Sequence, residues 1–171
     1  MSLGSLPECA AQLFGGSSHF VQLSRRTAED WVDDLVHVLR GRKSAQHIGI
    51  TPEAMFDDVD PETIRLSLLP VPRHGAEDLV KLLAHGSFYY GPDASLQQAD
   101  RARDECVRDI LRSVGAEAKF FTNHGHAENG DSADFFQAGF HYNSLAVTLY
   151  DVCLVAVSPD HLLVAWRFED A

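Results

Sequence analysis

The sequence has few cysteines, and their spacing matches no metal or redox motif. Cys9, Cys106 and Cys153 are too far apart for a C-x-x-C pair, and their odd number does not indicate a disulfide framework. We therefore predict free, buried thiols in a protein from a reducing compartment. Cys106 falls on the apolar stripe of an expected helix, which favours a structural thiol over a nucleophile.

Long apolar runs are also missing. The longest run covers residues 152–157, far short of the roughly 20 residues that a membrane-spanning helix needs. The opening segment MSLGSLPECAAQLFGG has no basic residues at its start and carries Glu8, so it does not resemble a signal peptide. We expect a soluble, cytoplasmic protein without a membrane partner.

Basic residues are scarce relative to acidic ones. The chain has 14 Lys and Arg against 25 Asp and Glu, which gives a formal net charge of −11. This charge repels nucleic acid and anionic membranes and favours a basic protein partner. The acids cluster in two segments, which we call the first acidic segment (residues 53–62) and the second acidic segment (residues 128–134). The acids in them are Glu53, Asp57, Asp58, Asp60, Glu62, Glu128, Asp131 and Asp134.

The usual signatures of catalysis are absent. The sequence contains no glycine-rich phosphate loop, no nucleophile elbow, no H-E-x-x-H pair and no calcium-loop pattern. Paired carboxylates such as Asp57 and Asp58 are usually solvated, and nothing selects one as a general acid or base. We predict a protein that is not an enzyme and that needs no cofactor.

What is present indicates one globular domain. An apolar fraction of 45% and a length of 171 residues fit a single domain over residues 1–171. Apolar spacing predicts helices near residues 5–14, 27–40, 76–85 and 95–114. Alternation predicts a strand at 63–69, and apolar, β-branched or aromatic stretches predict strands at 19–23, 117–122, 145–150, 152–158 and 162–168. We therefore expect an α+β fold, in which a mostly antiparallel sheet with a β-rich C-terminal third packs against three or four helices.

The stretch FTNHGHAENGDSADFF, residues 121–136, contains a possible metal site. His124 and His126 would share one face of a strand, and Glu128, Asp131, Asp134 or His141 could complete a ligand shell. The many Asn, Gly and Ser residues instead predict a solvated loop, which would have to be ordered before it could bind. We expect no metal here, and a small metal-dependent hydrolase using His124 and His126 is the alternative.

Aromatic residues near the acids suggest a binding surface. Carboxylates around aromatic anchors make a good docking site for a basic protein, because charge steers association and a few buried rings supply most of the affinity. In broad character only, the chain resembles bacterial immunity proteins, which inhibit a toxin stoichiometrically. We predict such an inhibitor, with a homo-oligomeric subunit joined through a sheet edge, for example a homodimer, as a further alternative. The expected partner-binding residues are the eight acids named above and Phe136.

Overall fold

The computed structural model describes residues 4–16, 18–43, 45–57 and 59–170. At its centre is a six-stranded sheet in the order β2-β1-β6-β5-β4-β3, and every neighbouring pair is antiparallel. The strands are β1 (His19–Arg25), β2 (His47–Gly49), β3 (Leu69–Val71), β4 (Lys119–Thr122), β5 (Tyr150–Val157) and β6 (His161–Glu169).

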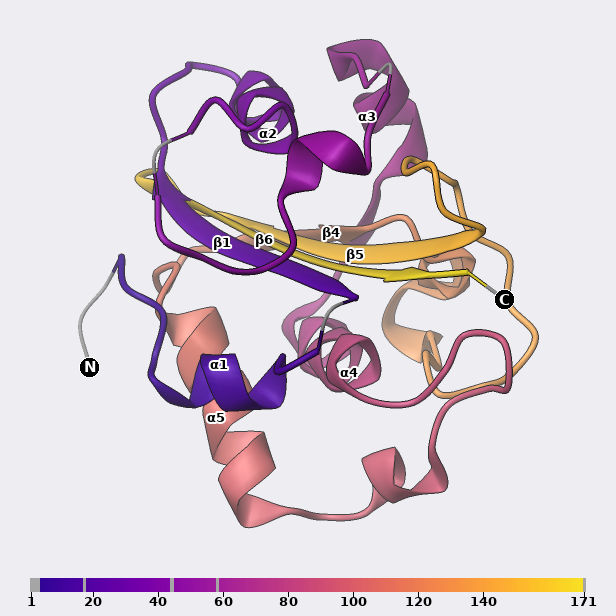
Figure 1. Cartoon of the computed structure of the whole chain (residues 1–171). Coiled ribbons are helices and arrows are strands. Elements are labelled where there is room, and N and C mark those ends of the chain that lie inside the picture. Colours follow the sequence, from indigo (N-terminus) through magenta and orange to yellow (C-terminus); the bar gives the residue numbers. More distant parts are fainter. Residues whose placement is uncertain (1–3, 17, 44, 58, 171) are drawn as a thin grey trace.

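Helices cover both faces of this sheet, as Figure 1 shows. Helices α2 and α3 lie on one face, and α1, α4 and α5 lie on the other. The α-helices are α1 (Cys9–Leu13), α2 (Trp31–Leu39), α3 (Pro61–Ser67), α4 (Arg73–Ala84) and α5 (Arg101–Arg112), and the 3-10 helices are η1 (Pro52–Ala54), η2 (Ala94–Gln97) and η3 (Gly125–Ser132). The expected α+β class is confirmed, with more helices than the three or four predicted.

The two central strands are apolar along their whole length because both of their faces are buried. In β5, Val152 and Leu154 point into the core beneath α4 and α5, whereas Cys153 and Val155 point into the core beneath α2. In β6, Trp166 is fully buried, and its ring packs edge-to-face against the ring of Phe56 with the two centroids 4.8 Å apart.

The helix starts differ from those expected. Asp30 caps α2, three residues after the expected start at residue 27, by accepting a hydrogen bond from the Val32 N–H at 2.9 Å. Asp100 caps α5 by accepting one from the Arg103 N–H at 3.1 Å, and the start of the helix predicted over residues 95–114 instead forms the separate turn η2. Both helices begin where an aspartate satisfies backbone N–H groups that have no partner within the helix.

The predicted strand over residues 63–69 is wrong, since this segment forms α3. Asp60 accepts a hydrogen bond from the Thr63 N–H at 2.8 Å, and Pro61 occupies the first turn, where its fixed φ angle suits a helix. Ile64 and Leu68, four residues apart, are buried, whereas Leu66 between them is 77% exposed. Ile64 and Leu68 therefore lie on the buried face of a helix, and the exposed Leu66 between them produced the apparent alternation of a strand.

The prediction of three free thiols is also wrong. Cys9 and Cys106 form a disulfide that joins α1 to α5 across a sequence separation of 97 residues. Cys153 is free and buried, and burial raises the pKa of its thiol strongly. The prediction of a reducing compartment rested on three free cysteines, so the structure no longer supports it.

Across the described ranges, no helix combines the length and the apolar character that crossing a membrane requires.

Candidate partner-binding surface

The two acidic segments lie over opposite faces of the sheet. Phe56 and Ile64, in or beside the first acidic segment, are buried in the core under α2. Ala127 and Phe135, in or beside the second, are buried in the core under α4 and α5. The acids of the two segments therefore do not form one continuous patch, and Asp58 lies outside the described residues.

One loop, residues 141–149, nevertheless reaches both segments at the end of the sheet. The Val147 N–H donates to the carbonyl oxygen of Met55 at 2.8 Å, which places the loop beside the first acidic segment. His141 Nε2 lies 3.4 Å from Glu128 Oε1 in the second segment. The loop thus contacts the first acidic segment through Met55 and the second through Glu128.

A buried carboxylate fixes the conformation of this loop. Asp151 is fully buried, and its side chain accepts hydrogen bonds from the Leu145 N–H (3.1 Å), the Ser144 hydroxyl (3.0 Å) and the Trp166 indole (3.1 Å). Burial raises the pKa of this carboxyl group, and these hydrogen bonds act in the opposite direction. Residues 145–149 therefore form a fixed loop and not the predicted strand, which begins only at Tyr150.

A second fixed loop, residues 86–91, follows α4. Gly86 turns the chain out of the helix with a φ angle of 87°, as the sequence predicted for a helix terminator. The Glu169 carboxylate then accepts hydrogen bonds from the Ser87 hydroxyl and from the Phe88 N–H at 3.0 Å. Burial would raise the pKa of Glu169, but these bonds hold it below its usual value. These hydrogen bonds to the Glu169 carboxylate hold the 86–91 loop against the end of β6.

The two loops present a chain of aromatic rings. The ring centroids of Tyr90 and Tyr89 lie 4.8 Å apart, and Tyr89 is followed by Tyr150 at 6.4 Å and by Tyr142 a further 6.0 Å on. Tyr89 is 56% exposed and Tyr90 is 87% exposed. We call this surface the aromatic face, and it consists of Tyr89, Tyr90, Tyr142, Val147, Leu149 and Tyr150.

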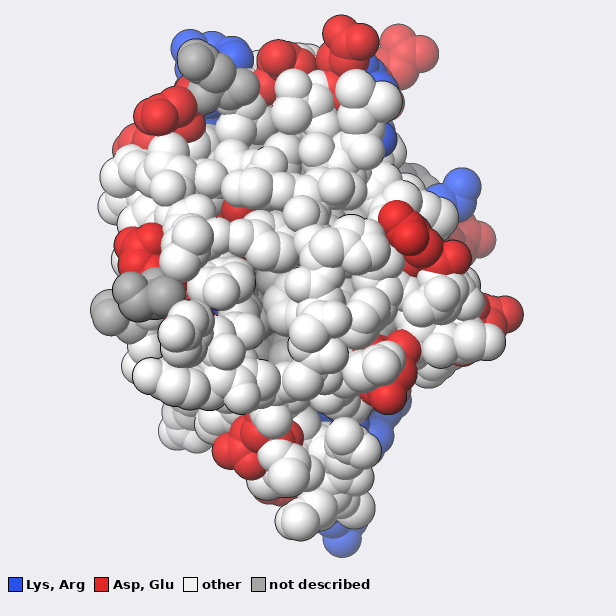
Figure 2. Space-filling model, turned by 90° about the vertical axis from the view of Figure 1, so that its right-hand side faces the viewer, with Lys and Arg blue, Asp and Glu red and all other residues white. Residues whose placement is uncertain are grey.

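The residues of the aromatic face are uncharged, and the carboxylates of Glu169 and Asp170 accept hydrogen bonds from the Tyr89 and Leu149 N–H groups beside it. Both loops lie on the right-hand side of Figure 1, and Figure 2 shows this side from the front. Asp and Glu lie around its margin, the middle is uncharged, and Lys and Arg are visible only at its outer edges. An exposed apolar patch with a polar rim is the arrangement found in protein–protein interfaces.

The predicted acids have unequal roles in the structure. The carboxylates of Glu53, Asp57 and Glu62 are exposed and bond to no other described residue. Asp60 is committed to capping α3, and the backbone hydrogen bond from Thr63 lowers the pKa of its carboxyl group. In the second segment, Glu128 contacts His141, Asp131 is exposed, and Asp134 accepts a hydrogen bond from the Phe136 N–H at 3.0 Å.

Phe136, the predicted aromatic contact, is less exposed than the rings of the aromatic face. Phe136 is half-buried and packs against the core, so it offers a partner little surface. The most exposed rings are Tyr89 and Tyr90, which the sequence analysis left out. Their signal was available, because Phe88-Tyr89-Tyr90 stands between Gly86 and Gly91-Pro92, where loop residues are expected at the surface.

The two histidines of the 121–136 stretch lie side by side, with ring centroids 4.8 Å apart. His124 is fully buried, its Nδ1 accepts a hydrogen bond from the His126 N–H at 3.1 Å, and its ring stacks on Phe140 at 4.1 Å. Burial, with the neighbouring His126 and His141, lowers the pKa of His124 to about 3. The expected solvated loop is thus wrong at His124, because tertiary packing encloses this polar residue.

The geometry also gives no support to the alternative functions. The described residues contain no group of three or more His, Cys, Asp or Glu side chains that could hold a metal ion. The sheet edges are the short strands β2 and β3, and β3 contains Pro70, which cannot donate a ladder hydrogen bond. These edges are poor templates for joining a second copy of the chain.

Comparisons with protein-family models, with curated proteins and with solved structures found no match to this chain. Its function therefore has to be inferred from the shape and charge of its own surface.

Proposed function

We propose that this protein is a stoichiometric inhibitor that binds another protein through the aromatic face, and specifically that it is an immunity protein neutralising a cognate toxin. The observation that carries the proposal is the uncharged aromatic face held between two acidic segments by the 141–149 loop. Its rings would supply the central contacts, and the acids at its margin would steer a basic partner towards it.

The rigidity of both loops supports a binding role. Asp151 and Glu169 already hold the loops in a single arrangement, so little conformational entropy is lost when a partner docks. The complementary partner is a basic toxin or effector domain with an apolar centre in its contact surface. In this proposal the protein acts by occlusion and performs no catalysis.

A cytoplasmic location is part of the proposal, and the disulfide provides its test. Disulfides persist mainly in oxidising compartments, so Cys9–Cys106 argues for such a compartment. Thiol titration of protein alkylated during lysis of the native host distinguishes the two locations. One free thiol after unfolding indicates an oxidising compartment, and three indicate a reducing one.

The decisive experiment combines capture with inhibition. Wild-type protein and a Tyr89→Ser, Tyr90→Ser variant are used as baits in the native host, and the activity of any captured toxin is titrated with each. Arg108→Ser is the matched control, because this exposed residue lies on α5, away from the aromatic face. We expect wild type and the control to abolish activity at one equivalent and the tyrosine variant to fail. A captured protein that keeps its activity when saturated would refute the proposal.

A further inference from the structure

A cavity of about 850 Å³ lies at the end of the sheet opposite the aromatic face. It forms where β2 stops, because β2 pairs only with Phe20 to Gln22 and leaves the outer edge of β1 open from Leu23 to Arg25. Its walls come from the segment that contains α1, from the end of β1 and from residues that follow α2. This volume falls within the range of small-molecule sites, roughly 300–1,000 Å³.

The cavity collects positive charge in an otherwise acidic protein. Arg25, Arg42 and Lys43 line it, whereas Glu8 is the only acid among its described lining residues. The whole chain has only 14 Lys and Arg against 25 Asp and Glu. A site that gathers three of these bases attracts an anion, although the protein as a whole repels one.

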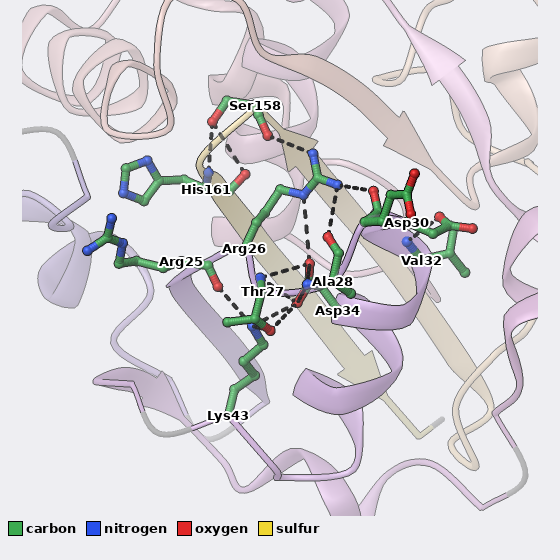
Figure 3. A network of polar contacts seen from close by, with 11 residues as sticks. Arg25, Arg26, Thr27, Ala28, Asp30, Val32, Asp34, Lys43, Ser158 and His161 are labelled. Atoms are coloured by element: carbon green, nitrogen blue, oxygen red, sulfur yellow. Dashed lines mark hydrogen bonds and ion pairs between the residues drawn. The ribbon is translucent and has the colours of Figure 1, made fainter.

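Lys43 is fixed by a buried network and so forms part of the wall. Figure 3 shows Lys43 and Arg26 converging on the carboxylate of Asp34, which is fully buried. Lys43 Nζ lies 2.8 Å from Asp34 Oδ1, and Arg26 Nε lies 3.7 Å from Asp34 Oδ2. Lys43 and Arg26 therefore neutralise the charge of Asp34, so Arg25 and Arg42 are not needed as its partners.

Arg25 and Arg42 remain available to a ligand. Neither guanidinium bonds to any residue in the described part of the chain, and in Figure 3 the guanidinium of Arg25 points away from the Asp34 network. Guanidinium groups bind carboxylates and phosphates through paired, charge-assisted hydrogen bonds. The two arginines can therefore supply the recognition of an anionic group.

The rest of the lining indicates the body of the ligand. Leu6, Leu23 and Ile48 provide apolar surface, and the described lining residues include no Phe, Tyr or Trp on which a planar base could stack. We propose that the cavity binds a small aliphatic anion, whose carboxylate or phosphate group is held by Arg25 and Arg42. This site is separate from the aromatic face and does not depend on the proposed inhibitor function.

Calorimetry with three probes tests the proposal. Octanoate and octyl phosphate carry the two possible head groups on one aliphatic chain, and 1-octanol is their uncharged counterpart. We expect at least one of the two anions to bind at one per protein and 1-octanol to bind at least about tenfold more weakly, since it lacks the charge-assisted bonds. The tighter of the two anions identifies the preferred head group. Failure of both anions to bind, or equal binding of 1-octanol, would overturn the proposal.

Variants locate the site. Arg25→Gln with Arg42→Gln should weaken the anion about tenfold or more, whereas Arg108→Gln, an exposed arginine on α5, should leave binding unchanged. Thermal melting checks that each variant is folded. If the double variant does not fold, amide chemical shifts of wild-type protein decide: changes centred on residues 23–27 support the site, and changes confined to the rest of the chain refute it.

Discussion

The backbone N–H of Val147 donates a hydrogen bond to the carbonyl oxygen of Met55 at 2.8 Å. Met55 lies in the first acidic segment, and Val147 belongs to the loop that also contacts Glu128 through His141. Through these two contacts, one loop joins segments that lie over opposite faces of the sheet. The charges of the acidic segments and the rings of the aromatic face can therefore be changed by separate substitutions, and their effects on binding can be measured separately.

Reversing rim charge should slow association. Asp57→Lys with Glu62→Lys changes exposed acids of the first acidic segment that bond to no described residue, so folding should be unaffected. Association with a basic partner should slow and become less sensitive to salt, since charges act over about 8 Å at physiological ionic strength. Stopped-flow measurements at several salt concentrations check this. Glu117→Lys, at the far end of the sheet, is the control, and equal rates for the two variants would exclude steering by this segment.

Asp60 is left out of that variant because it caps α3. Asp60→Lys should lower the thermal stability of the protein, since the Thr63 N–H loses its acceptor and a positive charge is placed at a helix N-terminus. Asp60→Asn, which keeps an acceptor oxygen, should retain most of the stability. Melting temperatures of the two variants provide the measurement, and an equal loss in both would argue against the cap.

Truncating an exposed ring should speed dissociation instead. Tyr90 is 87% exposed, so Tyr90→Ala should leave the free energy of unfolding almost unchanged. If Tyr90 is a central contact, its loss should raise the dissociation rate of the complex by about tenfold or more, with little effect on association. Tyr90→Phe, which keeps the ring, serves as the control. An unchanged dissociation rate for Tyr90→Ala would place the contact elsewhere.

Removing the disulfide should destabilise the protein without unfolding it. Cys9→Ser with Cys106→Ser opens a covalent loop that spans more than half of the 171-residue chain, and the loss should be roughly 2–5 kcal/mol in the free energy of unfolding. Urea denaturation measures this, with Cys153→Ala as the comparison at the buried free thiol. Identical midpoints for the double variant and the wild type would mean that the bond contributes nothing.

His124 should make stability depend on pH. Its folded-state pKa of about 3 lies below the ordinary 6.5, so the unfolded chain takes up a proton that the folded chain refuses. The contribution of neutral His124 to the free energy of unfolding is therefore complete above pH 6.5. It is lost as the pH falls towards 3, at up to about 1.4 kcal/mol per pH unit. His124→Asn should flatten the dependence of unfolding free energy on pH in this window. Buried His19, whose pKa is also lowered by burial, acts in the same direction and remains in the variant, so the difference between the two slopes isolates His124. Parallel slopes would contradict the assignment.

The sequence by itself determined the elements whose signals are local. Helix α5 follows from the apolar spacing that ends with Cys106, Ile110 and Val114, which are buried, whereas Ala99 and Ala102 at the start of the predicted stripe are exposed. Strands β5 and β6 follow from continuous apolar runs, and together these elements fix the α+β class. Such patterns are readable because a helix or strand repeats its geometry every few residues. Even α3 had a local signal in Asp60-Pro61, which the apolar alternation obscured.

Only the tertiary structure decided which distant residues meet. The Cys9–Cys106 disulfide, the burial of His124 and the contact between Val147 and Met55 each join segments whose proximity no local pattern encodes. The same holds for the aromatic face, since Tyr89 meets Tyr150 only because Glu169 anchors the 86–91 loop to the end of β6. Periodicity specifies which side of an element is buried, but the packing of the elements around the sheet decides what it is buried against and which rings remain at the surface.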